Sequence, residues 1–270
     1  MPKVRVNGIE MFYLEVGKPD AEPLVLIMGW GGDHTAWAFQ IPVFSQRYRV
    51  IAFDNRGAGQ TEAPDIPYSI RGMADDTIAL LDTLKVDRAH ICGLSMGGLI
   101  AQELAFAYPD RVRTLQLHVT LGRLDQWLRF RGESMAWMRS LDQREPFTKM
   151  LLSWVLSPST FEHKPELVQL LIARALDNPY PTTRVGFERQ AQAMEGITTL
   201  ARLAELRMPT LITFGADDIM VPTRFGGELA AHIPHAEVVE IPQAGHLHMI
   251  EQPEAFNEAV LGFLAKHEGS

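Results

Sequence analysis

The sequence has a single cysteine, Cys92, among its 270 residues. This excludes a disulfide within the chain and a zinc site built from several thiolates. No apolar run approaches the roughly 18–20 residues needed to span a bilayer. The first residues, 1–9, lack the basic stretch followed by an apolar stretch that a secretory signal requires. We therefore expect a cytoplasmic protein.

Positive charge is also scarce, with 25 Lys and Arg against 33 Asp and Glu and a formal net charge of −8. Nucleic acids and anionic membranes are bound through clustered Lys and Arg, so this balance disfavours both as partners. The apolar fraction of 46% is enough to bury a sizeable core. The sequence therefore predicts a folded domain whose partner is a small molecule.

Strand and helix patterns alternate over residues 1–120. Polarity alternates on both sides of Asn7-Gly8, which favours a type I′ hairpin turn. The apolar run 24–28 is typical of a strand buried on both faces. Further strands are expected at 48–53, 88–94 and 111–119, and helices at 35–46, 69–84 and 97–108. This alternation predicts a mostly parallel sheet with helices on both faces, an α/β fold.

The pattern changes over residues 121–203, where four helical stretches follow one another with no convincing strand. Alternation resumes over 204–270. We expect an α/β core of residues 1–120 and 204–270, with an eight-stranded sheet and an inserted all-helical lid at 121–203. The lid would lie over the carboxyl edge of the sheet, where open α/β sheets bind ligands. An apolar lid would also offer a surface for a homodimer.

Gly93-Leu94-Ser95-Met96-Gly97 matches the pattern G-x-S-x-G, directly after an apolar strand and directly before a helix. That context is typical of a nucleophile elbow, in which glycines permit a tight, strained turn. The helix that follows would point its first amides at an oxyanion forming on Ser95. The alternative is a serine in an ordinary turn between a strand and a helix.

The run Ile91-Cys92-Gly93-Leu94-Ser95-Met96-Gly97-Gly98 and the order of elements resemble the α/β-hydrolase superfamily over essentially the whole chain, least in the lid. Within it, the run is most similar to 3-oxoadipate enol-lactonases and related small carboxylesterases. The resemblance implies a catalytic triad in the order Ser, Asp, His, with no metal and no organic cofactor.

The base and the acid of this triad are sought in the last two loops. His246 follows Gly245 after the last expected strand, as the family's histidine does, whereas His248 is interpreted as a lid-facing or structural residue. Two acids, Asp217 and Asp218, follow the preceding strand. The family spacing from Gly215 to the proline four residues after the acid selects Asp218 and makes Asp217 a loop-capping residue.

Two backbone N–H groups are expected to form an oxyanion hole, one from Met96 after the nucleophile and one from Trp30 in the glycine-rich loop 28–32. Many relatives begin this loop with His-Gly, but this chain has Met28-Gly29, which removes a side chain that braces the loop. The motif that begins at Asp54 resembles a structural turn of the superfamily, so we do not expect Asp54 to be catalytic.

The substrate pocket is expected to include Gly29 and the lid residues Trp127, Met135 and Trp154, although lid aromatics more often pack among themselves. His34 and His118 are further candidates for its border. Lid arginines are candidates for a substrate carboxylate, with solvent as the alternative: Arg123, Arg129 and Arg131.

These features predict a serine hydrolase that cleaves a small carboxylic ester or lactone through an acyl-enzyme. Serine at the elbow points away from dehalogenases and epoxide hydrolases, whose relatives carry Asp there. Carbon–carbon bond hydrolases often have Asn before the serine, where this chain has Leu94. They stay open as alternatives, together with peptidases, perhydrolases and a receptor or signalling protein that retains the triad.

Overall fold

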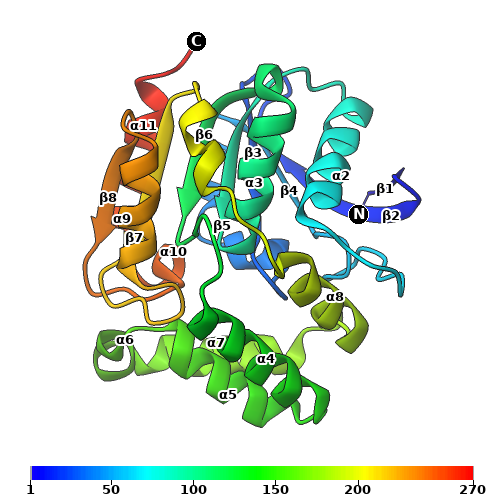
Figure 1. Cartoon of the computed structure of the whole chain (residues 1–270), viewed down its shortest axis with the longest axis vertical. Helices are drawn as coiled ribbons and strands as arrows, with labels where there is room; N and C mark the ends of the chain where they lie inside the picture. The colour runs from blue at the N-terminus through cyan, green and yellow to red at the C-terminus, as the bar shows by residue number, and fades with distance from the viewer. Residues whose placement is uncertain (1, 270) are drawn as a thin grey trace.

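A computed structural model describes residues 2–269 of the chain (Figure 1). Within these residues one eight-stranded sheet has the order β1-β2-β4-β3-β5-β6-β7-β8. β1 and β2 form an antiparallel hairpin, and β2 runs antiparallel to β4; every other neighbouring pair is parallel. The mostly parallel sheet predicted from the sequence is confirmed. The strands are β1 (Lys3–Val6), β2 (Ile9–Val16), β3 (Pro23–Ile27), β4 (Arg49–Phe53), β5 (Ala89–Leu94), β6 (Val112–His118), β7 (Thr210–Gly215) and β8 (Glu237–Ile241).

The first hairpin follows from its turn residues. Asn7 and Gly8 both have positive φ, 42° and 82°, and Val6 pairs with Ile9 across them. Two central residues with positive φ define the type I′ turn, whose twist matches that of the flanking strands. The predicted turn is therefore confirmed.

Helices cover both faces of the sheet, because the inner strands are apolar on both sides. In β3, Val25 belongs to the buried cluster that includes residues of α2, α3 and α9 on one face, and Leu24 belongs to the cluster that includes residues of α1, α10 and α11 on the other. The helical elements outside the insertion are η1 (His34–Trp37), α1 (Ile41–Phe44), α2 (Ile70–Thr83), α3 (Met96–Ala107), η2 (Pro109–Arg111), α9 (Thr223–His232), α10 (His248–Glu251) and α11 (Pro253–Ala265), and η3 (Leu200–Glu205) spans the end of the insertion.

The chain between β6 and β7 is helical, and we refer to residues 121–203 as the helical insertion. Figure 1 shows α4–α7 gathered beyond one end of the strands, with α8 closer to the sheet. Among the described residues of the insertion, the only strand-like pairing is an isolated bridge between Arg123 and Thr198. Its helices are α4 (Gln126–Ser140), α5 (Arg144–Val155), α6 (Pro158–His163), α7 (Pro165–Asp177) and α8 (Arg184–Met194).

Two of the sequence-based expectations for helices were wrong in detail. The stretch 35–46 forms two short helices rather than one, because Pro42 has no amide hydrogen to continue a helix and instead lies in the first turn of α1. The described part of the insertion contains five α-helices rather than four helical stretches, since Pro158 and Pro165 each begin a new one.

None of the helices within residues 2–269 combines the length and the apolar character required to cross a membrane.

Candidate active site

Ser95 lies in a strained turn between β5 and α3. Its φ of 56° and ψ of −118° are unusual for a residue with a side chain. The turn is held by main-chain and side-chain hydrogen bonds: the Ser95 amide donates to the carbonyl of His118 (2.9 Å), and the Thr120 hydroxyl donates to the carbonyl of Ser95 (2.7 Å). This geometry presents the serine at the carboxyl end of β5.

Glycines surround this turn because nothing larger fits. A methyl group at Gly97 would overlap the carbonyl oxygen of Ile27, and one at Gly93 would overlap the main chain of Gly97. A methyl group at Gly29 would lie 3.0 Å from Cβ of Ser95. The glycine pattern is therefore a packing requirement of the turn and of the loop beside it.

His246 and Asp218 are hydrogen-bonded to each other. Nδ1 of His246 lies 2.8 Å from Oδ2 of Asp218, and both residues are buried. The other carboxylate oxygen of Asp218 accepts the amides of Met220 (2.7 Å) and Val221 (2.9 Å), which fixes its orientation. The neighbouring Asp217 is exposed, and its amide donates to the carbonyl of Ala244. Of the two acids, only Asp218 therefore contacts the histidine.

Within residues 2–269, the Ser95 hydroxyl and the His246 ring are not hydrogen-bonded to each other. The structure thus contains one formed link, from Asp218 to His246, and a serine on a separate turn at the same edge of the sheet.

His248 is a structural residue rather than a lid-facing one. Its Nε2 lies 2.7 Å from the Thr213 hydroxyl, which also contacts Nδ1 of His118 at 2.7 Å. Burial lowers the pKa of His118 to about 3 and lowers the pKa of His248 well below its ordinary value. Both rings are therefore neutral and belong to the core. His118 does not line the cavity described below.

Two main-chain N–H groups are candidates for the oxyanion hole. In the part of the chain that the structure describes, the main-chain N–H groups of Met96 and Trp30 donate to no acceptor. Both residues line the same cavity as Ser95. The side chain of Trp30 is held by a hydrogen bond from Nε1 to the carbonyl of Phe187 (2.8 Å) and by stacking on that ring at 4.3 Å. Met96 therefore follows the serine directly, Trp30 shares the cavity with it, and the insertion holds the side chain of Trp30.

The loop that carries Trp30 is braced without a histidine at position 28. Nδ2 of Asn55 donates to the carbonyl of Met28 at 2.7 Å, and the amide of Gly31 donates to Oε1 of Gln190 at 2.9 Å. The sequence-based interpretation gave no individual role to Asn55 or to Gln190. Asn55 belongs to the motif that begins at Asp54, so the structural role expected for that motif could have indicated it. Gln190 lies far from the loop in the sequence, and no pattern indicated it.

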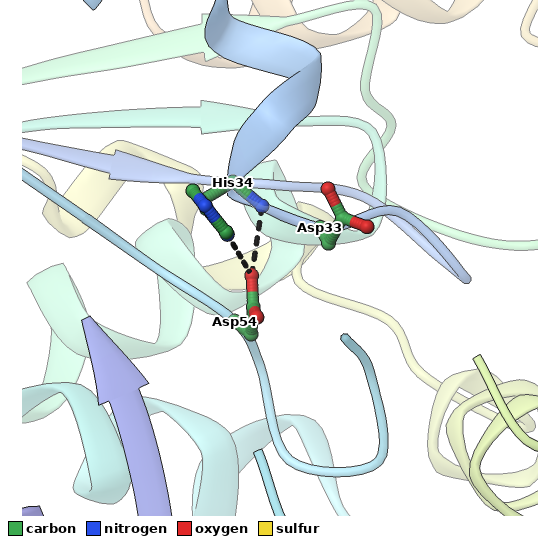
Figure 2. A group of neighbouring side chains, drawn as sticks. All are labelled: Asp33, His34 and Asp54. Carbon is green, nitrogen blue, oxygen red and sulfur yellow. Dashed lines mark hydrogen bonds and ion pairs between the residues drawn. The ribbon is translucent and has the colours of Figure 1, made fainter. Parts of the chain in front are cut away.

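Asp33, His34 and Asp54 form a compact group of possible metal ligands, whose donor atoms lie within 4.8 Å of one another (Figure 2). Asp54 already accepts three donors, namely the His34 amide (2.8 Å), the His34 ring (2.7 Å) and the Gln60 amide (2.8 Å). Both oxygens of Asp33 are likewise occupied, by Thr35 and by Asn178. With its oxygens used in this way, the cluster is a brace for the loop after Trp30.

The charge of the His34 ring in this brace changes with pH. Burial by itself lowers the pKa of His34, but the hydrogen bond and the negative charge of Asp54 outweigh burial, so that the pKa is raised. His34 was one of two candidates for the border of the pocket, and it does not line the cavity described below.

A cavity of about 380 Å³ opens beside Ser95. Its walls are mainly aliphatic and come from the elbow, from the segment that follows β6 and from helices α4 and α8 of the insertion. Met135 lines it, as expected. The buried His246 and Asp218 are outside its lining among the described residues. Its size lies within the usual range for small-molecule sites, roughly 300–1,000 Å³.

Three of the expected pocket residues are placed elsewhere. Trp127 and Trp154 lie on the two sides of the Arg131 guanidinium, 4.6 and 4.9 Å from it, rather than in the cavity wall. Gly29 packs against Ser95 without lining the cavity. Sequence spacing failed here because a cation between two aromatic rings comes from the way helices pack together.

The arginines of the insertion also divide into separate roles. Arg123 pairs with Glu228 at 3.0 Å, which removes it from the cavity. Arg131 lines the cavity but donates to the carbonyl of Ile219 in the loop of Asp218. Arg129 also lines the cavity and is exposed. The structure thus leaves Arg129 as the candidate for a charged substrate group.

The fold and this arrangement agree with a match to known proteins. The chain belongs to the α/β-hydrolase fold family, whose model matches residues 22–253. The chain is 31% identical over 259 residues to 3-oxoadipate enol-lactonase 2 of Acinetobacter baylyi, covering 94% of this chain and 92% of the relative. The solved structure of the enol-lactonase from Burkholderia xenovorans LB400 superposes with a TM-score of 0.88 at 30% identity, covering 98% of this chain and all of that one.

A relative with a different name is equally similar. A Mycobacterium tuberculosis protein named as a non-heme bromoperoxidase, BpoC, is 32% identical over 273 residues, covering 95% of this chain and 98% of the relative. The family therefore establishes a hydrolase without establishing its substrate.

Proposed function

We propose that the protein hydrolyses a small carboxylic ester or lactone through an acyl-enzyme formed on Ser95. The observation that carries this proposal is the strained serine at the mouth of an apolar cavity, on the same sheet edge as a buried His246–Asp218 pair. A serine hydroxyl is a poor nucleophile until a base removes its proton. The paired imidazole is the base in this proposal.

In the first half of the reaction, Nε2 of His246 takes the proton of Ser95 as Oγ attacks the substrate carbonyl. Asp218 accepts the hydrogen bond from Nδ1 and stabilises the imidazolium. The amides of Met96 and Trp30 bind the oxyanion, and each such donor contributes on the order of 3 kcal/mol to transition-state stabilisation. His246 then protonates the leaving alkoxide; in a lactone, this oxygen stays attached to the acyl group.

In the second half, His246 takes a proton from water as the water attacks the acyl-enzyme; the bond from the acyl carbon to Oγ then breaks, and His246 returns the proton to Oγ, which releases the carboxylic acid and free Ser95. The mechanism requires the Ser95–His246 hydrogen bond to form when substrate is bound. Such bonds are often long or poorly aligned before substrate binds. The aliphatic walls of the cavity favour an apolar acyl or alkyl group, and we propose that the helical insertion acts as its lid.

Labelling with a fluorophosphonate tests the nucleophile. We expect a single adduct on the peptide that carries Ser95, and none in a Ser95→Ala variant. Adduct on another residue, or no adduct on the folded protein, would contradict the proposal. Turnover of short p-nitrophenyl esters, lactones and enol-lactones then identifies the substrate class. Many cycles per enzyme support hydrolysis, whereas a single burst supports the receptor alternative.

Perhydrolysis is a second candidate, and the name of the M. tuberculosis relative favours it. Hydrogen peroxide would replace water as the nucleophile, so that the same acyl-enzyme releases a peracid. The ratio of peracid to acid formed at a fixed peroxide concentration measures this activity. A ratio at the level of the uncatalysed reaction rejects it.

A further inference from the structure

Glu251, at the end of the short helix α10, has a completely buried carboxylate. Its Oε1 accepts the amide of Gly245 at 2.8 Å. Its Oε2 accepts the amide of Ser157 at 2.7 Å and the hydroxyl of Thr160 at 2.6 Å. Gly245 directly precedes His246, while Ser157 and Thr160 begin helix α6 of the insertion. One carboxylate therefore joins the loop of the proposed base to the insertion.

The same two segments also touch through their main chains. The amide of Leu247 donates to the carbonyl of Val155 at 3.1 Å, and a methyl group at Gly245 would lie 2.9 Å from that carbonyl and from the Ser157 amide. Contacts with the insertion are therefore made on both sides of His246, at the residue before it and at the residue after it.

A buried carboxylate is tolerated only when donors replace the water it has lost. Glu251 has three, and hydrogen bonds to a charged acceptor are stronger than neutral ones. With an apolar residue in place of Glu251, the buried amides of Gly245 and Ser157 would lose their acceptor, which destabilises the contact between the two segments. The most direct effect would be movement of the peptide next to His246.

We propose that Glu251 is a positioning residue, which holds the loop of His246 against residues 155–160 of the insertion and so sets the direction of the imidazole toward Ser95. The insertion then takes part in the alignment of the proposed base as well as in forming the cavity. This inference rests on the proposed function, because it assigns Glu251 a role in the same reaction.

A Glu251→Gln variant tests it, since glutamine keeps the shape but replaces one acceptor oxygen by an amide donor that faces N–H or O–H groups. We expect kcat per active site, counted by fluorophosphonate, to fall about 10–100-fold, the loss typical of a small misplacement of a reacting group. The KM should change less than twofold, because Glu251 does not line the cavity. The pH profile of kcat/KM should also shift, since the environment of the imidazole changes.

Thr160→Val provides a second and milder variant if Glu251→Gln does not fold, because it removes only one donor to Glu251. We expect kcat per active site to fall about threefold to tenfold. Thr148→Val, at another buried threonine of the insertion, is the matched control and should stay at the wild-type value.

The inference would be overturned if Glu251→Gln kept a kcat per active site within twofold of wild type. If Glu251→Gln is unfolded, the same result for Thr160→Val would overturn it. Labelling of wild-type Ser95 in the same experiment separates the two failures. If wild type is not labelled, the proposed function is wrong; if it is labelled and these variants keep full kcat, only the role of Glu251 is wrong.

Discussion

Large clusters of buried apolar residues cover both faces of the inner strands of the sheet, whereas the helical insertion encloses a separate cluster of four buried residues, Leu152, Val155, Leu156 and Val168. Large aromatic side chains on the outer surface of α4 are exposed, Phe130 by 70% and Trp137 by 64%. The sheet is thus a continuous core, and the insertion is a thin layer of helices. This difference indicates that the sheet fixes the proposed reacting groups, while the insertion shapes the cavity and supports the loops beside it.

The largest expected effect tests whether the sheet loops carry the chemistry. Asp218→Asn should lower kcat about 10⁴-fold, because the amide favours the wrong imidazole tautomer and does not stabilise the imidazolium. Steady-state kinetics on an active ester measure this effect. Asp217→Asn is the matched control at the exposed neighbour and should retain wild-type activity. Equal losses in the two variants would contradict the assignment of the acid.

The second prediction compares stability in the two regions. Phe256, completely buried against His118 and His248, lies under the sheet. Phe256→Ala should lower the free energy of unfolding by about 3–5 kcal/mol. Leu152→Ala in the insertion should cost about 2 kcal/mol, at the lower end of such substitutions, because a thin layer relaxes more easily around the cavity. Urea unfolding measures both, and a larger loss for Leu152→Ala would reverse the comparison.

A smaller effect is expected at the cavity wall of α4. Met135→Ala removes apolar contact with substrate and should raise KM for an apolar ester about fivefold, equivalent to about 1 kcal/mol. Trp137→Ala, on the exposed side of the same helix, is the control and should leave KM unchanged. If both variants raised KM alike, the effect would come from destabilised α4 rather than from the cavity.

The smallest effect concerns the brace formed by His34 and Asp54. The pKa of His34 is raised in the folded protein, so the pair stabilises the fold fully below the ordinary histidine pKa of 6.5 and loses this contribution as pH rises through the higher folded value. We expect wild type to lose up to about 1 kcal/mol more than His34→Gln over that range. Urea unfolding at a series of pH values measures the difference, and identical pH profiles would exclude the effect.

The sheet and the turn at Ser95 were predictable because their signals are local. Continuous apolar runs indicate strands covered on both faces, and the glycines around Ser95 reflect contacts within a few residues or with the adjacent strand. The choice of Asp218 over Asp217 relied on the family's spacing, and it is Asp218 that lies 2.8 Å from His246.

The insertion was harder to interpret because its helices pack through side chains distant in sequence. Trp127 and Trp154 were expected in the pocket but lie on either side of Arg131, and no periodicity indicates that such a contact will form. Glu251 and Gln190 were missed for the same reason. Glu251 binds the amide of Ser157, which is 94 residues away in the chain, and Gln190 binds the amide of Gly31, which is 159 residues away.

The sequence by itself determined which residues form strands and where the glycine-lined turn at Ser95 falls, because these depend on hydrophobic pattern and on local backbone sterics. The loops of the proposed acid and base were identified through the resemblance to the α/β-hydrolase superfamily. Only the tertiary structure decided which arginine reaches the cavity, how the loop of Trp30 is held and what supports the loop of His246. Those choices depend on burying polar groups with distant partners, and a buried carboxylate such as Glu251 can select its donors only after the sheet and the helices have come together.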